Sequence, residues 1–130
     1  MIRVLIADNQ PRARRSLQTL LTAIQWSSTS GVARGDRLME IVGEATDGPQ
    51  VIDQVQILQP EVVVMDLNLP RLDGLVVISL LKRRWPKIRI VVLTMYATDR
   101  AAALEAGADA FLLKGCPTDE LLAAVRLGLR

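Results

Sequence analysis

The chain has 130 residues, of which 50% are hydrophobic but only 3% aromatic, and its formal net charge is +2. This length and composition predict one domain with an aliphatic core. No apolar stretch approaches the roughly 20 residues that cross a bilayer, and residues 1–8 lack a signal-peptide cleavage site. The single cysteine, Cys116, excludes a disulfide framework, and the lack of histidine excludes any step that needs a histidine of this chain. We therefore predict a cytoplasmic protein without a membrane segment and interpret Cys116 as structural rather than redox-active.

Apolar runs that are typical of strands alternate with helical patterns along the chain. The expected strands are residues 2–7, 38–45, 62–65, 88–93 and 110–113. The expected helices begin near Pro11, after residues 47–49, after residues 73–74, near residues 98–99 and at Pro117. Near-continuous valine, as in residues 62–65, is typical of a strand that is buried on both faces of a parallel sheet. Five such units predict a doubly wound α/β domain, with a five-stranded parallel sheet and helices on both faces. We expect the strand order 2-1-3-4-5, one of the two common orders of such sheets, in which the first and third strands are neighbours.

Residues 25–37, between the first helix and the second strand, interrupt this alternation. The segment is polar and rich in small residues, and it is longer than the roughly 2–6 residues that usually join a helix to a strand. It follows the end of the first helix, so we expect it at the pole of the sheet away from Asp8 and Asp66. We interpret it as a tolerated insertion, and the alternative is a partner-binding loop anchored by Trp26. No linker or second domain is predicted, so residues 1–130 are expected to form one domain.

A run of basic residues lies around the end of the third predicted helix and the start of the fourth strand. It consists of Lys82, Arg83, Arg84, Lys87 and Arg89. We interpret it as a solvated surface rather than a nucleic-acid patch, because most charge runs are simply exposed.

Polar residues stand at the C-terminal ends of four predicted strands: Asp8, Asp66, Thr94 and Lys114. Because the carboxyl ends of parallel strands share one edge of the sheet, we expect these side chains to lie close together. Two neighbouring carboxylates repel each other unless a hard cation such as Mg²⁺ binds between them, and the backbone carbonyl of Asn68 offers a further oxygen ligand. In such a pocket Asp66 is a candidate nucleophile toward a phosphoryl group, with Lys114 and Thr94 contacting the phosphoryl oxygens.

Several segments of the chain resemble the receiver domains of two-component response regulators. The segments that carry the resemblance are residues 42–48, 66–74, 93–96, 107–114 and 120–125. Residues 66–74, with the sequence Asp-Leu-Asn-Leu-Pro-Arg-Leu-Asp-Gly, are similar to the family's phosphoacceptor loop, and the other variants are most similar to its NarL/LuxR-type branch. The resemblance covers the whole chain except residues 25–37. It implies a flavodoxin-like (CheY-like) fold and a cytoplasmic signalling receiver that catalyses only its own phosphoryl transfer and dephosphorylation.

The resemblance also implies partners and roles for individual residues. A sensor histidine kinase would transfer a phosphoryl group from its own histidine to Asp66. The implied Mg²⁺ ligands are Asp8, Asn9, Asp66 and the backbone of Asn68. Thr94 would then move toward the phosphoryl group and Phe111 would turn inward behind it, although a phenylalanine at this position can also pack without switching. These movements would reshape the surface of the fourth helix, fifth strand and fifth helix, where the family usually forms its homodimer or effector contacts.

The output implied by the NarL/LuxR-type branch is control of transcription. In that branch DNA is bound only by a C-terminal effector domain, which residues 1–130 do not include. Neither the cognate kinase nor the target genes follow from the sequence.

Two residues depart from the family pattern. Asn9 stands where the family usually has a second acid that contacts the metal, so we expect weaker Mg²⁺ binding. The alternative function is therefore a degenerate receiver that acts as a phosphate-independent interaction module. Gly115 stands where many members have proline, which makes a cis peptide bond there improbable.

Two other classes of protein are disfavoured by the sequence. A phosphatase with an aspartate nucleophile usually carries a second acid where this chain has Asn68. A dinucleotide-binding domain needs glycines after its first strand, and residues 8–11 contain none.

Overall fold

The computed structural model describes residues 1–27 and 38–126. Its elements in chain order are β1 (Ile2–Ala7), α1 (Pro11–Ser27), β2 (Met39–Ala45), α2 (Gly48–Leu58), β3 (Val62–Met65), α3 (Gly74–Arg84), β4 (Arg89–Thr94), the 3₁₀ turn η1 (Ala97–Asp99), α4 (Arg100–Ala106), β5 (Ala110–Leu113) and α5 (Thr118–Arg126). All five predicted strands are present, each within a residue of its expected bounds. No helix in the described part of the chain is long and apolar enough to cross a membrane.

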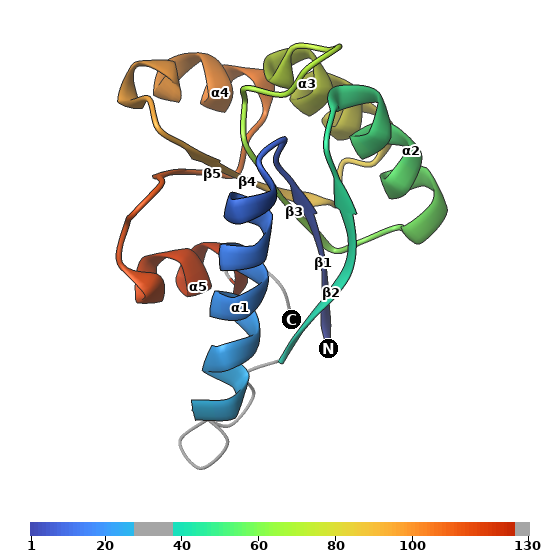
Figure 1. The fold of residues 1–130 in the computed structure, drawn as a ribbon. Helices are drawn as coiled ribbons and strands as arrows, with labels where there is room; N and C mark the ends of the chain where they lie inside the picture. The colour runs from blue at the N-terminus through green and yellow to red at the C-terminus, as the bar shows by residue number, and fades with distance from the viewer. Residues whose placement is uncertain (28–37, 127–130) are drawn as a thin grey trace.

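The strands form one parallel sheet in the order β2-β1-β3-β4-β5. Helices α1 and α5 cover one face of this sheet, and α2, α3 and α4 cover the other (Figure 1). The predicted doubly wound fold and strand order are therefore confirmed. Since order 2-1-3-4-5 places β1 beside β3, the residues that follow these two strands must lie next to each other.

The core is divided by the sheet into two aliphatic layers. Along β3, Val63 and Met65 pack toward α2, α3 and α4, whereas Val62 and Val64 pack toward α1 and α5. All four side chains are at most 1% exposed. Burial of each such side chain stabilises the fold by roughly 1.5–3 kcal/mol, which explains why this strand is apolar at every position.

The boundary of the predicted insertion is corrected by α1. Residues 25–27 are helical and extend α1 to Ser27, so the interruption begins later than residue 25. The rest of the predicted insertion, residues 28–37, and the side chain of Trp26 lie outside the described residues.

The loop between β3 and α3 rests against the first turn of α2. The N–H of Gly48 donates to the carbonyl oxygen of Pro70 at 3.2 Å. A Cβ atom at Gly48 would lie 2.5 Å from Cβ of Leu72 and 2.8 Å from its carbonyl oxygen. Only glycine allows this approach, so the residue at position 48 helps to fix the loop that follows Asp66.

Aspartates begin the helices on both sides of this contact. Asp47 Oδ1 accepts from the N–H of Gln50 at 2.8 Å at the start of α2, and Asp73 Oδ1 accepts from the N–H of Leu75 at 2.8 Å at the start of α3. Each cap satisfies a backbone donor that the first helical turn would otherwise leave free.

Candidate functional site

Three of the predicted site residues meet at the carboxyl edge of the sheet. Asp8 follows β1 and Asp66 follows β3, the strand that pairs with β1. The Lys114 ammonium, at the end of β5, lies 2.8 Å from Asp8 Oδ2 and 2.8 Å from Asp66 Oδ2. Thr94 ends β4 beside them, and its carbonyl oxygen accepts from the N–H of Lys114 at 2.8 Å.

Both carboxylates are held in a defined orientation. Asp8 is 2% exposed and Asp66 is 6% exposed, so their charges need nearby partners. Asp8 Oδ1 accepts from the N–H of Gln10 at 2.9 Å, and Asp66 Oδ1 accepts from the N–H of Asn68 at 3.1 Å. These two turns leave both Oδ2 atoms free to converge on one cation, the ammonium of Lys114.

The ammonium of Lys114 is bound more tightly than an ordinary surface lysine. Burial alone would lower the pKa of Lys114, but the hydrogen bonds and charges of Asp66 and Asp8 outweigh it and raise the pKa. Lys114 is thus protonated at neutral pH and neutralises one of the two carboxylate charges.

Thr94 on β4 and Phe111 on β5 are both buried. Thr94 is 0% exposed, and its Oγ1 has no hydrogen-bond partner in the described part of the chain. Phe111 is 8% exposed and packs in the core layer beneath α3 and α4. The ring of Phe111 therefore lies inside the core in this structure, and its role in a switch stays a prediction.

The oxygen donors at this edge suit a magnesium ion better than a softer metal. The described residues contain no group of three or more histidine, cysteine, aspartate or glutamate side chains that could hold a metal. The converging atoms are instead Oδ2 of Asp8 and Asp66, while Asn9 and Asn68 are exposed in the adjoining loops. Mg²⁺ is typically held by only one or two carboxylates and keeps several waters. The residues present therefore fit Mg²⁺, with fewer charges than a three-acid site.

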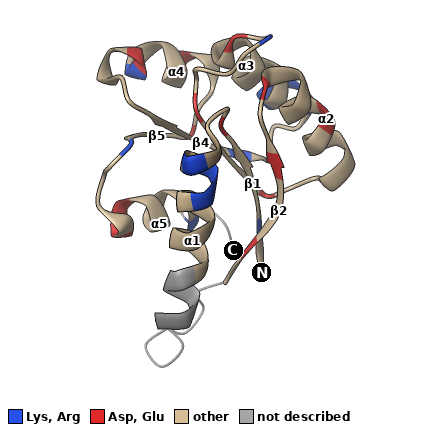
Figure 2. Cartoon of the chain, in the orientation of Figure 1, with Lys and Arg blue, Asp and Glu red and all other residues tan. Residues whose placement is uncertain are grey.

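One contact of the site was not predicted from the sequence. Arg14 Nη1 donates to the carbonyl oxygen of Asp8 at 2.7 Å, and Arg14 Nε donates to Glu44 Oε1 at 3.2 Å. Figure 2 shows the basic first turns of α1, where this residue lies, in blue. The only signal in the sequence is an arginine in the first turns of the helix that follows Asp8, which by itself is unspecific.

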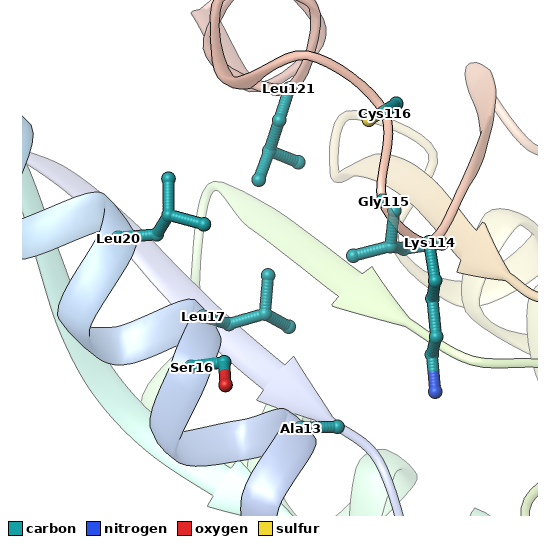
Figure 3. Close-up of a pocket in the computed structure, with 9 residues that line it drawn as sticks. Ala13, Ser16, Leu17, Leu20, Lys114, Gly115, Cys116 and Leu121 are labelled. Atoms are coloured by element: carbon teal, nitrogen blue, oxygen red, sulfur yellow. The ribbon is translucent and has the colours of Figure 1, made fainter.

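An apolar pocket of about 190 Å³ lies between α1 and α5 and borders Lys114. Leu17 and Leu20 of α1 face Leu121 of α5 across it (Figure 3). Cys116 also lines the pocket, and burial together with the charge of Glu120 raises the pKa of its thiol. A raised pKa disfavours the reactive thiolate, which agrees with a structural role for this cysteine.

Two residues of the predicted basic surface form contacts within the fold. Lys82 Nζ pairs with Asp109 Oδ2 at 2.7 Å and donates to the carbonyl oxygen of Ile88 at 2.8 Å. Arg89 Nε donates to the carbonyl oxygen of Ala124. Two members of the run thus join neighbouring elements of the fold.

Comparisons with known proteins match the chain to one family of domains. The sequence profile described as the response regulator receiver domain matches residues 4–126. The nitrate/nitrite response regulator protein NarP of Escherichia coli is 33% identical over 129 residues, which cover 98% of this chain and 54% of NarP. A protein-glutamate methylesterase/protein-glutamine glutaminase of Myxococcus xanthus is 35% identical over 116 residues, which cover 87% of this chain and 30% of that protein.

A solved structure is similar over almost the whole chain. The isolated receiver domain of RcsB from Salmonella enterica serovar Typhimurium, determined with the phosphomimetic BeF₃⁻, superimposes with a TM-score of 0.79 at 27% identity. The match covers 98% of this chain and 89% of that one. The match with the isolated receiver thus covers nearly all of both chains. By contrast, the chain spans about half the length of NarP and less than a third of the methylesterase.

Proposed function

Because the chain belongs to the response regulator receiver domain family, we propose that it acts as a phosphorylation switch with Asp66 as the phosphoacceptor. The observation that carries this proposal is the convergence of Asp66 Oδ2 and Asp8 Oδ2 on the ammonium of Lys114, each at 2.8 Å. A nucleophilic carboxylate, a second carboxylate and a fixed cation at one edge of the sheet are what transfer of a phosphoryl group to aspartate needs.

The proposed reaction transfers a phosphoryl group from a phosphohistidine of a sensor kinase. A carboxylate oxygen of Asp66 attacks the phosphorus atom, an O–P bond forms, and the N–P bond of the donor breaks with its electron pair returning to the donor imidazole. Asp8, Asn9 and the backbone carbonyl of Asn68 are the further candidates to hold Mg²⁺, which when bound would neutralise charge on the phosphoryl oxygens. Lys114 supplies a second positive charge beside Asp66, 2.8 Å from its Oδ2 atom.

Thr94 is the proposed link between the phosphoryl group and the rest of the fold. Its hydroxyl has no hydrogen-bond partner in the described residues, so it is free to donate to a phosphoryl oxygen on Asp66. Movement of Thr94 would pull on β4 and on the loop that follows it, and Phe111 on β5 would repack against this loop. Phosphorylation would thereby act on the surface built by α4, β5 and α5.

Exposed apolar side chains on α4 and β5 support a contact there, because exposed apolar patches often mark interaction sites. Leu104 on α4 is 40% exposed and Leu113 on β5 is 41% exposed, and Met95 at 65% and Tyr96 at 56% follow β4 in the adjoining loop. We propose that this α4-β5-α5 face forms a homodimer or binds an effector. From the resemblance to the NarL/LuxR-type branch, the proposed output is transcription, with DNA bound by a separate C-terminal effector domain.

Labelling with a small phosphodonor tests the proposed acceptor. The chain is incubated with acetyl phosphate and Mg²⁺, and the product is resolved on a phosphate-affinity gel. We expect a shifted band that needs Mg²⁺, disappears in hydroxylamine and is absent from Asp66→Asn. Labelling that persists in Asp66→Asn would refute Asp66 as the acceptor. A wild-type chain that is folded but never labelled would favour the degenerate receiver that Asn9 suggests.

A further inference from the structure

The guanidinium of Arg14 joins the loop after β1 to the end of β2. It donates to the carbonyl oxygen of Asp8 at 2.7 Å through Nη1 and to Glu44 Oε1 at 3.2 Å through Nε. The Arg14 side chain is only 16% exposed, and its contact with the carbonyl oxygen of Asp8 is partly buried, whereas its pair with Glu44 is exposed to solvent. The N–H of Asp8 donates to the carbonyl oxygen of Ala45 at 3.0 Å. The main chain of Asp8 is therefore held by β2 on one side and by Arg14 on the other.

This contact orients the peptide group between Asp8 and Asn9. The carbonyl oxygen of Asp8 and the N–H of Asn9 belong to one planar unit, so fixing the oxygen also fixes the direction in which Asn9 leaves the strand. The N–H of Gln10 binds Asp8 Oδ1 at 2.9 Å from inside the same turn. Arg14 therefore holds, from its outer side, the turn that orients Asp8 Oδ2 toward Lys114.

We propose that Arg14 is a positioning residue for metal binding at this site. The inference rests on the proposed function, because it concerns the same carboxylates. Asn9 offers only a neutral amide oxygen as a metal ligand. A carboxylate would attract a cation from a wider range of positions, so the placement of the Asn9 amide decides whether it contributes to Mg²⁺ binding. Residues that orient metal ligands without touching the metal typically change metal affinity by about 10–100-fold when they are removed.

Charge and positioning predict opposite results for the same substitution. If only its charge acted on the site, removing Arg14 would tighten Mg²⁺ binding, because a nearby positive charge repels the metal. If Arg14 positions the loop, its removal weakens Mg²⁺ binding. Arg15 is an exposed neighbour on α1, and no side-chain hydrogen bond or ion pair joins it to another described residue. Arg15→Gln therefore removes the same charge without the contact and serves as the matched control.

Calorimetric titration of the chain with MgCl₂ tests the proposal in wild type, Arg14→Gln, Arg14→Lys and Arg15→Gln. We expect the Kd for Mg²⁺ to rise about tenfold in Arg14→Gln, to rise less in Arg14→Lys, whose ammonium cannot reach both acceptors in the same way, and to stay level or fall in Arg15→Gln. The Mg²⁺ concentration for half-maximal labelling by acetyl phosphate should rise in parallel. Urea denaturation in EDTA selects conditions in which each variant is folded.

The proposal is overturned if Arg14→Gln and Arg14→Lys bind Mg²⁺ as tightly as Arg15→Gln. That result leaves the proposed function intact, provided that the wild-type chain binds Mg²⁺ and labels on Asp66. A wild-type chain that does neither contradicts the proposed function and this inference together.

Discussion

Replacing Thr94 with valine should make the protein more stable while removing its response to phosphorylation. Thr94 Oγ1 is 0% exposed and has no hydrogen-bond partner in the described residues. An unpaired buried hydroxyl costs about 1–3 kcal/mol, and valine replaces it with a methyl group of similar size whose burial adds up to about 0.8 kcal/mol. Valine also suits a strand as well as threonine does. We expect Thr94→Val to raise the free energy of unfolding by about 1–2 kcal/mol.

Urea denaturation without divalent cations measures this change. The midpoint should rise with an unchanged slope, and the melting temperature should rise by about 3–8 °C for a domain of this size. Thr94→Ser is the control, because it keeps the hydroxyl and loses only the methyl group, at a cost of about 1 kcal/mol. A lower midpoint for Thr94→Val would mean that the hydroxyl is already hydrogen-bonded, and Thr94 would then not be a donor waiting for a phosphoryl oxygen.

Three further substitutions test the packing, the backbone and the charges around the site. Gly48→Ala should lower the free energy of unfolding by about 1–3 kcal/mol and slow labelling of Asp66, because the new Cβ would lie 2.5 Å from Cβ of Leu72. An unchanged urea midpoint would show that the β3–α3 loop can shift freely. Gln59→Gly should raise the free energy of unfolding by up to about 1 kcal/mol, because Gln59 ends α2 at φ 48°, a left-handed conformation that favours glycine. A lower urea midpoint would contradict this explanation of the helix end. Lys114→Met should destabilise the fold at pH 8 by about 1–3 kcal/mol, since it leaves two carboxylates facing each other. The stabilisation by Lys114 is complete below the pKa of lysine in the unfolded chain and is lost as the pH rises through the raised pKa of the folded state. The difference between wild type and Lys114→Met should therefore narrow above pH 10.5, the ordinary pKa of lysine, and a difference that stays constant to pH 12 would refute the ion-pair explanation.

The fold could be predicted from the sequence because runs of apolar residues mark its strands. Residues 62–65 are apolar at every position, and a strand of this kind has to lie between two helical layers. The neighbouring positions of Asp8 and Asp66 then follow from strand order, and Lys114 and Thr94 follow from the common edge. Besides the period of the strands and the direction of the chain, these inferences need the strand order 2-1-3-4-5, which the resemblance to receiver domains implies.

Other features depend on side-chain reach that no pattern reveals. Nothing in the sequence separates Arg14, which contacts the main chain of Asp8, from the exposed Arg15 beside it. The insertion was predicted to begin at residue 25, whereas α1 continues to Ser27, because residues 25–27 contain no glycine or proline that would mark the end of the helix. The orientation of Phe111 was also open, since a ring within a four-residue strand such as β5 can face solvent or the core.

Asn9 gives the site its most informative test, because it sets the balance of charge. Asp8 and Asp66 carry two negative charges and Lys114 cancels one, so one negative charge remains to attract Mg²⁺. Asn9→Asp restores a second. We expect Asn9→Asp to bind Mg²⁺ at least about threefold more tightly, from the added Coulomb attraction.

The same change should act in the opposite direction when no divalent cation is present. A third carboxylate then faces two others and a single ammonium, so the free energy of unfolding in EDTA should fall, by less than about 1 kcal/mol because Asn9 is exposed. Calorimetric titration and urea denaturation of the same preparation measure both effects, with Asn9→Ala as the control for loss of the amide. An affinity for Mg²⁺ that is unchanged in Asn9→Asp would show that position 9 lies outside the metal's reach, and the weak-metal explanation of this receiver would then be wrong.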